Sequence, residues 1–158
     1  MTDKKTVYAG TPPQSDENTS NLANAMERKL ELVKLVLEFI EQNQKDDKPI
    51  TAASIVIDGY SQEEVYHTVR LLDGEGFILV YASEIDRKNY LPSHAMPKVN
   101  IHRLTWDGHD FLGNTRDTVS WEATKKTASN FSLKIISQVL EKLVLHSVTN
   151  TLKGMGLL

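Results

Sequence analysis

The stretch YSQEEVYHTVRLLDGEGFILVY, from Tyr60 to Tyr81, decides the fold of this chain. Ser61 and Glu64 have the spacing of a capping box, in which two side chains satisfy free backbone N–H groups at a helix start. With 3.6 residues per turn, one face of this helix carries the residues we expect to be buried: Val65, Thr68, Val69 and Leu72. Gly74 and Gly76 then end the helix, and the apolar run that follows them predicts a strand.

The whole chain predicts an α+β fold that is mostly helical. A capped helix, a glycine stop and an apolar strand are typical of a winged helix-turn-helix domain, in which the recognition helix leads into the wing. We expect this domain to have a long helix at 21–42, a short strand at 54–58, a recognition-type helix at 61–75, a wing at 77–104 and a helix at 105–116. A C-terminal helical extension at 117–158 contains a short helix at 120–128 and a longer one at 132–154.

Local signals place the less regular elements. Ile55, Val56 and Ile57 favour the strand at 54–58, although the residues just before them could instead open a turn of helix. Asp58-Gly59 supplies a turn into the recognition-type helix, so the usual middle helix of the domain is reduced or missing. Thr105 caps the helix at 105–116. Its expected buried residues are Trp106, Phe111 and Leu112.

The long helix at 21–42 is apolar on two sides, so it needs two packing partners. The winged domain covers one side. The last helix can cover the other, either within the chain or from a second copy. We expect a homodimer whose interface contains Leu32, Leu35, Val36, Phe39, Ile136, Leu140 and Leu143.

Composition limits the class of protein. The 158 residues carry a formal net charge of -3, so no overall positive field attracts nucleic acid, although a local basic strip can. The chain has no cysteine and no apolar run of membrane-spanning length, which favours a cytoplasmic protein that does not contact membrane. Residues 1–20 are polar and contain paired prolines, so we expect a disordered tail.

Nothing in the sequence indicates catalysis. The chain has no nucleophile elbow, and Gly74-Glu75-Gly76 lacks the lysine and the longer glycine pattern of a phosphate-binding loop. His94, His102 and His109 match no zinc-ligand spacing. We therefore expect no catalytic residue, no metal site and no cofactor.

The outer face of the helix at 61–75 offers candidates for binding double-stranded DNA. Residues near the start of a recognition helix meet base edges in the major groove. The candidate nucleic-acid-binding residues are Tyr66, His67, Arg70, Arg87, Lys88, Lys98 and Arg103. Glu63 and Glu64 oppose this assignment, because they would face phosphates. The alternative is a non-enzymatic accessory protein that uses the same scaffold to bind a host or phage protein.

Four segments resemble a family of short proteins from phages and prophages, domain of unknown function 2513. They are MERKLELVKLVLEFIE from Met26, DGYSQEEVYHTVRLLDGEGFI from Asp58, RLTWDGHDFL from Arg103 and DTVSWEATKKTASNFSLKIISQVLEKL from Asp117. The resemblance spans Met26 to the C-terminus. It implies a winged-helix-like fold and a phage or prophage setting, and it assigns no functional residues.

Overall fold

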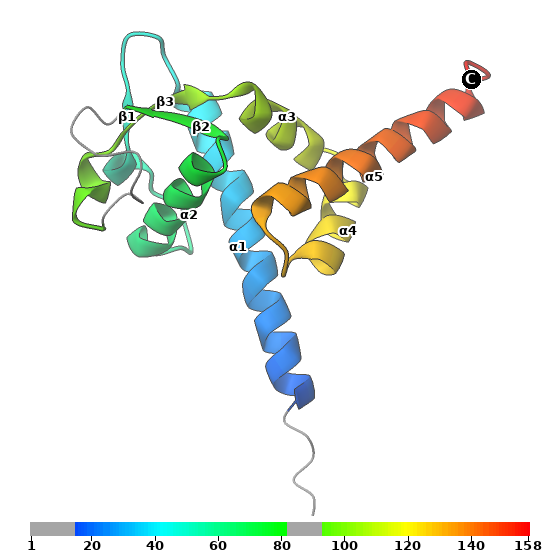
Figure 1. Ribbon diagram of the computed structural model, residues 1–158, viewed down its shortest axis with the longest axis horizontal. Coiled ribbons are helices and arrows are strands. Elements are labelled where there is room, and N and C mark those ends of the chain that lie inside the picture. Colours follow the sequence, from blue (N-terminus) through cyan, green and yellow to red (C-terminus); the bar gives the residue numbers. More distant parts are fainter. Residues whose placement is uncertain (1–14, 82–92) are drawn as a thin grey trace, which may run out of the picture.

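A computed structural model describes residues 15–81 and 93–158 (Figure 1). The mostly helical α+β class is confirmed. The elements are α1 (Ser15–Asn43), β1 (Ile50–Thr51), the 3-10 helix η1 (Ala52–Ser54), α2 (Gln62–Gly74), β2 (Ile78–Tyr81), the 3-10 helix η2 (Ser93–Lys98), β3 (Asn100–Leu104), α3 (Trp106–Thr115), α4 (Thr118–Ala128) and α5 (Leu133–Gly154). Residues 1–14 of the predicted tail, and Arg87 and Lys88 of the predicted wing, lie outside the described residues.

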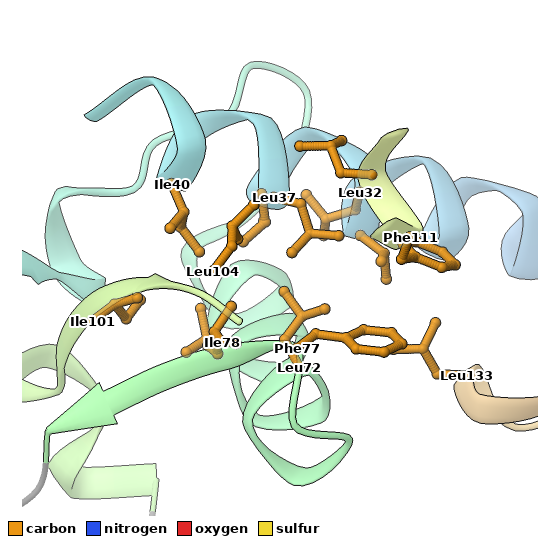
Figure 2. Close-up of a cluster of buried hydrophobic side chains, with 14 of the residues drawn as sticks. Leu32, Leu37, Ile40, Leu72, Phe77, Ile78, Ile101, Leu104, Phe111 and Leu133 are labelled. Carbon is orange, nitrogen blue, oxygen red and sulfur yellow. The ribbon is translucent and has the colours of Figure 1, made fainter. Parts of the chain in front are cut away.

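The long helix α1 is the centre of the fold. It starts at Ser15, inside the predicted tail, because residues 15–20 contain no proline or glycine that would stop it. It packs against α2, β3, α3 and α4, which bury apolar residues on two sides of its C-terminal half, whereas Leu22 near its start is 58% exposed. Figure 2 shows Leu32, Leu37 and Ile40 of α1 in one cluster with side chains of α2, α3 and the sheet.

The sheet has three antiparallel strands in the order β1-β3-β2. Ile50 of β1 and Val80 of β2 both lie opposite Ile101 of β3, and all three side chains are buried. A bulge between Leu79 and Val80 shifts the register of β2 against β3. Successive side chains of β2 point to opposite faces of the sheet, so Ile78 and Val80 are buried while Leu79 and Tyr81 are exposed.

The predicted strand at 54–58 is wrong. The short strand is β1, and η1 follows it directly. Ile55 is still buried, but Val56 is 69% exposed and neither residue belongs to a strand. The side-chain N–H group of Gln62 donates to the carbonyls of Ala52 (3.3 Å) and Ile55 (3.2 Å), so these carbonyls need no sheet partner.

The end of α2 is joined to the start of α3. Gly76 has a φ of +73°, and the N–H of Phe77 donates to the carbonyl of Leu72 (2.9 Å), as in a Schellman motif. The Thr105 hydroxyl donates to the Gly76 carbonyl (2.6 Å), and the Thr105 N–H donates to the Phe77 carbonyl (3.0 Å). Gly108 packs directly on that carbonyl. The end of α2 and the start of α3 are therefore held together by two hydrogen bonds from Thr105 to backbone carbonyls and by the packing of Gly108.

The predicted burial of Trp106 is wrong, since its side chain is 87% exposed. Phe111 and Leu112 are buried as expected. The close approach at Gly108 fixes which side of α3 faces inward, and the first residue of the helix then points outward. Phe111 stacks on Phe77 with ring centroids 5.2 Å apart and meets the buried Trp121 of α4 edge to face.

The residues expected at a dimer interface are mostly core residues of a single chain. Leu32, Val36, Ile136 and Leu140 are buried, while Leu35, Phe39 and Leu143 are half-buried. Helices α3 and α4 cover α1, and α5 packs on α3 and α4. The second apolar side of α1 is thus covered largely within the chain, and of the seven predicted interface residues Leu35, Phe39 and Leu143 keep part of their surface exposed.

Candidate nucleic-acid interface

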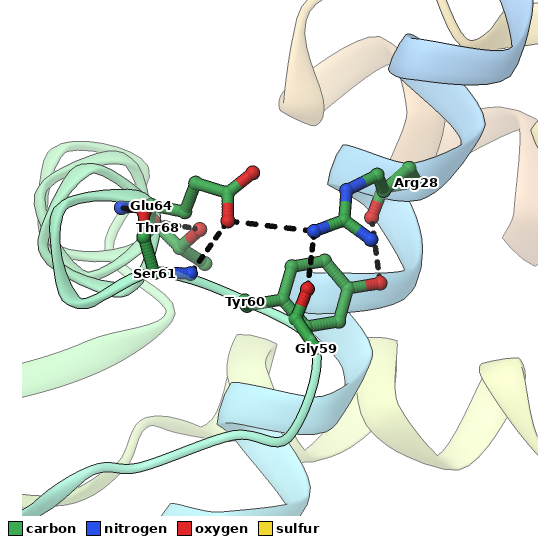
Figure 3. A network of polar contacts seen from close by, with 6 residues as sticks. All are labelled: Arg28, Gly59, Tyr60, Ser61, Glu64 and Thr68. Atoms are coloured by element: carbon green, nitrogen blue, oxygen red, sulfur yellow. Dashed lines mark hydrogen bonds and ion pairs between the residues drawn. The ribbon is translucent and has the colours of Figure 1, made fainter.

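The start of α2 is fixed to α1 by a polar network around Arg28 (Figure 3). Ser61 accepts from the N–H of Glu64 (3.2 Å), and Glu64 accepts from the N–H of Ser61 (2.7 Å), which completes the capping box. The Arg28 guanidinium donates to the Gly59 carbonyl, lies 3.5 Å from Glu64 and stacks 4.0 Å above the Tyr60 ring. These contacts join the start of α2 to α1 at the surface, beside the apolar packing of the two helices.

This network accounts for one of the two acidic residues that opposed DNA binding. The hydrogen bond from the Ser61 backbone lowers the pKa of Glu64, and the charge of Arg28 lowers it further. Glu64 is therefore an ionised cap with a cation beside it, and it presents no uncompensated carboxylate to a ligand. Glu63 is exposed in the same turn.

A local group of basic side chains combines His67 and Arg70 of α2 with Lys29 of α1, and we call these three residues the positive cluster. His67 is exposed, Arg70 is half-buried, and neighbouring Tyr66 is half-buried against the core. Partial burial lowers the pKa of His67, and the positive charges of Arg70 and then Lys29 lower it further. Lys29 comes from α1, 38 positions before His67 in sequence (67 − 29 = 38), so sequence spacing could not reveal it.

The other candidate residues divide between two places. Lys98 is exposed at the end of η2, which packs against α2. Arg103 is exposed on β3 opposite Leu79, in a groove that none of the described residues of α2 lines. The structure therefore brings His67 and Arg70 together with Lys29, and it places Arg103 on a different surface.

The groove that contains Arg103 has a composition of its own, and we call it the Trp106 groove. Its walls include Lys45, Leu79, Tyr81, Arg103 and Trp106. Tyr81 is 58% exposed, and its ring meets His102 edge to face at 5.5 Å between centroids. Sequence reasoning missed this groove because it assigned Trp106 to the core.

The histidines do not form a metal site in the part of the chain that is described. Across residues 15–81 and 93–158, no three His, Cys, Asp or Glu side chains gather as metal ligands would. His109 lies 3.7 Å from Glu41, which also pairs with Arg116 at 2.6 Å. This ion cluster joins α1 to α3. Among the helices of the same residues, none has the length and apolar character needed to cross a lipid bilayer.

Comparison with known proteins identifies the family. The model of the family described as "Hypothetical protein (DUF2513)" matches residues 27–134, and the chain belongs to this family. The matched region begins next to Met26, as the sequence resemblance implies, but it ends within the first turn of α5 rather than at the C-terminus. No curated protein and no solved structure matches the chain.

Proposed function

We propose that this DUF2513 protein is a winged-helix DNA-binding protein, and that it acts as a transcriptional regulator in a phage or prophage. The order helix, strand, short turn of helix, helix and hairpin supports the winged-helix assignment. So does the strand order β1-β3-β2, in which the first strand pairs with the last. In this assignment α2 is the recognition helix, and η1 replaces the usual middle helix. The phage setting rests on the resemblance of the four sequence segments.

The positive cluster of Lys29, His67 and Arg70 is the observation that carries the DNA proposal. His67 and Arg70 lie three residues apart on α2, and the charges of Arg70 and Lys29 lower the pKa of His67, so the three side chains belong to one region of the surface. The pairing of Arg28 with Glu64 removes one negative charge from the approach to this cluster. The positive charges of Lys29 and Arg70 would attract a DNA phosphate to this surface.

A binding titration tests the proposal. We expect the full chain to retard duplex DNA from its own genome at low salt. Lys29→Ala should weaken binding to all sequences and reduce the log-log salt slope by about 0.9, the value for one lost phosphate contact. Lys126→Ala is a matched control, because Lys126 is an exposed lysine on α4 and lies outside the cluster. Wild-type protein that retards no duplex at low salt would contradict DNA binding.

The Trp106 groove favours a second function, the binding of a protein partner. An indole that is 87% exposed beside Leu79 and Tyr81 forms an apolar surface, and such surfaces mark interaction sites. Lys45 and Arg103 border it together with one carboxylate, Asp46, so a partner segment with a bulky apolar residue next to a carboxylate that reaches Arg103 fits best. A photo-crosslinker placed at position 45, on the wall of the groove, would capture such a partner in host cells. Capture should be lost in Trp106→Ala protein and kept in Lys29→Ala protein.

A further inference from the structure

The second half of α5 is an exposed helix with an apolar stripe. From Glu141 to the C-terminus no residue is buried, and Figure 1 shows this half extending away from the other helices. Leu145, Val148 and Met155 are 64%, 48% and 67% exposed, and Leu152 is half-buried. Their spacing of three, four and three residues places them on one side of the helix. We call these four residues the distal stripe.

The distal stripe continues into a groove between α3 and α5. Val144, Leu145 and Val148 line its apolar floor on α5, so the stripe and the groove share two residues. The walls are acidic, with four carboxylates from Glu75, Asp107, Asp110 and Glu141. Lys134 and His109 are the basic residues among the described lining residues. The groove therefore suits a helix with an apolar side and a positive charge.

The second half of α5 has that chemistry itself. From Glu141 onward it contains Lys142, His146 and Lys153, and its one carboxylate side chain is Glu141 itself, which belongs to the wall of the groove. Lys142, His146 and Lys153 are all exposed. An apolar stripe on a positively charged helix thus lies beside an acidic groove with an apolar floor, on the same molecule.

We propose that a second copy of this chain fills the groove: the distal half of α5 from each protomer docks between α3 and α5 of the other. Two observations favour a second copy over an unrelated helix. The charges of the distal half and of the groove are opposite. Leu145 and Val148 belong to both surfaces, so one two-fold contact buries the stripe and the groove of both protomers together. The sequence predicts a homodimer interface centred on α1, whereas the interface proposed here lies on the distal half of α5 and the groove between α3 and α5.

Sedimentation velocity of the full chain, from low micromolar to hundreds of micromolar, tests the interface. We expect a reversible dimer. Leu145→Glu should weaken it at least about tenfold, a loss of about 1.4 kcal/mol, because a carboxylate would enter an acidic apolar contact. Val119→Glu is the matched control, since Val119 is 81% exposed on α4 and does not line the groove. It should leave the dimer unchanged.

A charge-exchange experiment distinguishes this specific interface from non-specific self-association of the protein. Lys153→Glu and Asp110→Lys should each weaken the dimer, and the chain carrying both changes should recover affinity. Both residues are exposed, so both variants should fold, which thermal melting checks. A single-chain mass for wild-type protein at the highest concentration would overturn the proposal. So would a dimer that Leu145→Glu leaves intact. Because these readouts need no DNA, their failure is distinct from failure of the proposed function.

Discussion

Gly108 of α3 packs on the backbone carbonyl of Phe77, and a Cβ atom at position 108 would overlap that oxygen. The obstacle is backbone, and the same carbonyl accepts from the N–H of Thr105, so it cannot turn away without breaking a hydrogen bond. The approach of α3 to the start of β2 therefore depends on the absence of a side chain. This contact also sets which residues of α3 face the core.

Replacing Gly108 with alanine should destabilise the fold by about 2 kcal/mol or more, because the overlap forces α3 away from Phe77. Gly113 is the matched control in the same helix. A Cβ there meets nothing within 4 Å, so Gly113→Ala should stabilise the protein by about 0.5 to 1 kcal/mol. Urea unfolding of both variants measures these changes. Equal effects of the two substitutions would contradict the packing argument.

The ion pair between Glu31 of α1 and Lys125 of α4 should contribute to stability. The side chain of Lys125 is buried, and its Nζ lies 2.9 Å from carboxylate oxygens of both Glu31 and Glu122. Glu31 also accepts a hydrogen bond from the Trp121 indole N–H (3.3 Å). Lys125→Met should cost about 1 to 2 kcal/mol, a value limited by the partial exposure of Glu31. Lys126→Met, one residue further on the exposed side of α4, should change the free energy of unfolding little.

The same pair makes stability depend on pH at both ends of the range. Burial raises the pKa of Glu31, but the hydrogen bond and charge of Lys125 outweigh it, and the net pKa is lowered. This contribution is present above about pH 4.3, the ordinary pKa of glutamate, and is lost as the pH falls through the lowered value. Burial lowers the pKa of Lys125, but the hydrogen bonds and charges of Glu122 and Glu31 outweigh this effect, and the net pKa is raised. The stability that Lys125 contributes is therefore lost only at strongly alkaline pH. Glu31→Gln should flatten the acid limb in urea unfolding followed across pH. An unchanged acid limb would contradict this account.

The capping box should support α2 more than the Arg28 ion pair does. Ser61→Ala removes the acceptor for the Glu64 N–H and should cost about 1 kcal/mol. Glu64→Gln keeps an acceptor for the Ser61 N–H but removes the charge that faces Arg28, an exposed pair at 3.5 Å. Exposed pairs contribute little, so this variant should lose less stability than Ser61→Ala. Thermal melting compares the two, and the reverse order would show that the ion pair dominates.

DNA binding should strengthen as the pH falls from 8 to 6. In the free protein, partial burial and the charges of Arg70 and Lys29 hold the pKa of His67 below its ordinary value. A phosphate beside His67 would favour the protonated ring, so binding takes up a proton. His67→Gln should bind with little dependence on pH in this range. Anisotropy titrations at constant ionic strength measure this, and a pH dependence that survives in His67→Gln would exclude His67 as its source.

Trp106 should be the tryptophan that solvent reaches. Its side chain is 87% exposed, whereas Trp121 is 2% exposed beneath α3 and α1. Acrylamide should quench part of the emission of the wild-type protein, and Trp106→Phe should abolish that part. The remaining emission should be that of a buried indole. Strong quenching in Trp106→Phe protein would contradict the placement of the two rings.

Local sequence signals predict the starts of α2, α3 and α5, but not those of α1 and α4. Ser61, Thr105 and Ser132 each accept a hydrogen bond from the N–H three residues later, as their residue types predict. His67 and Arg70 could be placed on one helix face for the same reason, since they lie three residues apart.

The sequence-based predictions that proved wrong, or that missed a residue, depend on contacts between residues far apart in the sequence. Ile55–Ile57 has the composition of a strand, but the edges of β3 are already paired with β1 and β2. Strand propensity does not tell which of two neighbouring segments pairs with β3. Trp106 has an apolar side chain, yet its direction depends on Gly108 meeting Phe77, 31 positions earlier (108 − 77 = 31). Lys29 joins His67 only because α1 and α2 pack together.

The junction at Thr105 has a mechanical consequence. Its hydroxyl and N–H hold the last backbone carbonyls after α2, and α3 begins at the next residue. Helix α3 in turn packs on α5. We therefore expect a tilt of α2 to move α3 with it, and to move α5 through its packing on α3. Because the distal half of α5 projects from the body, the displacement would be largest near Met155.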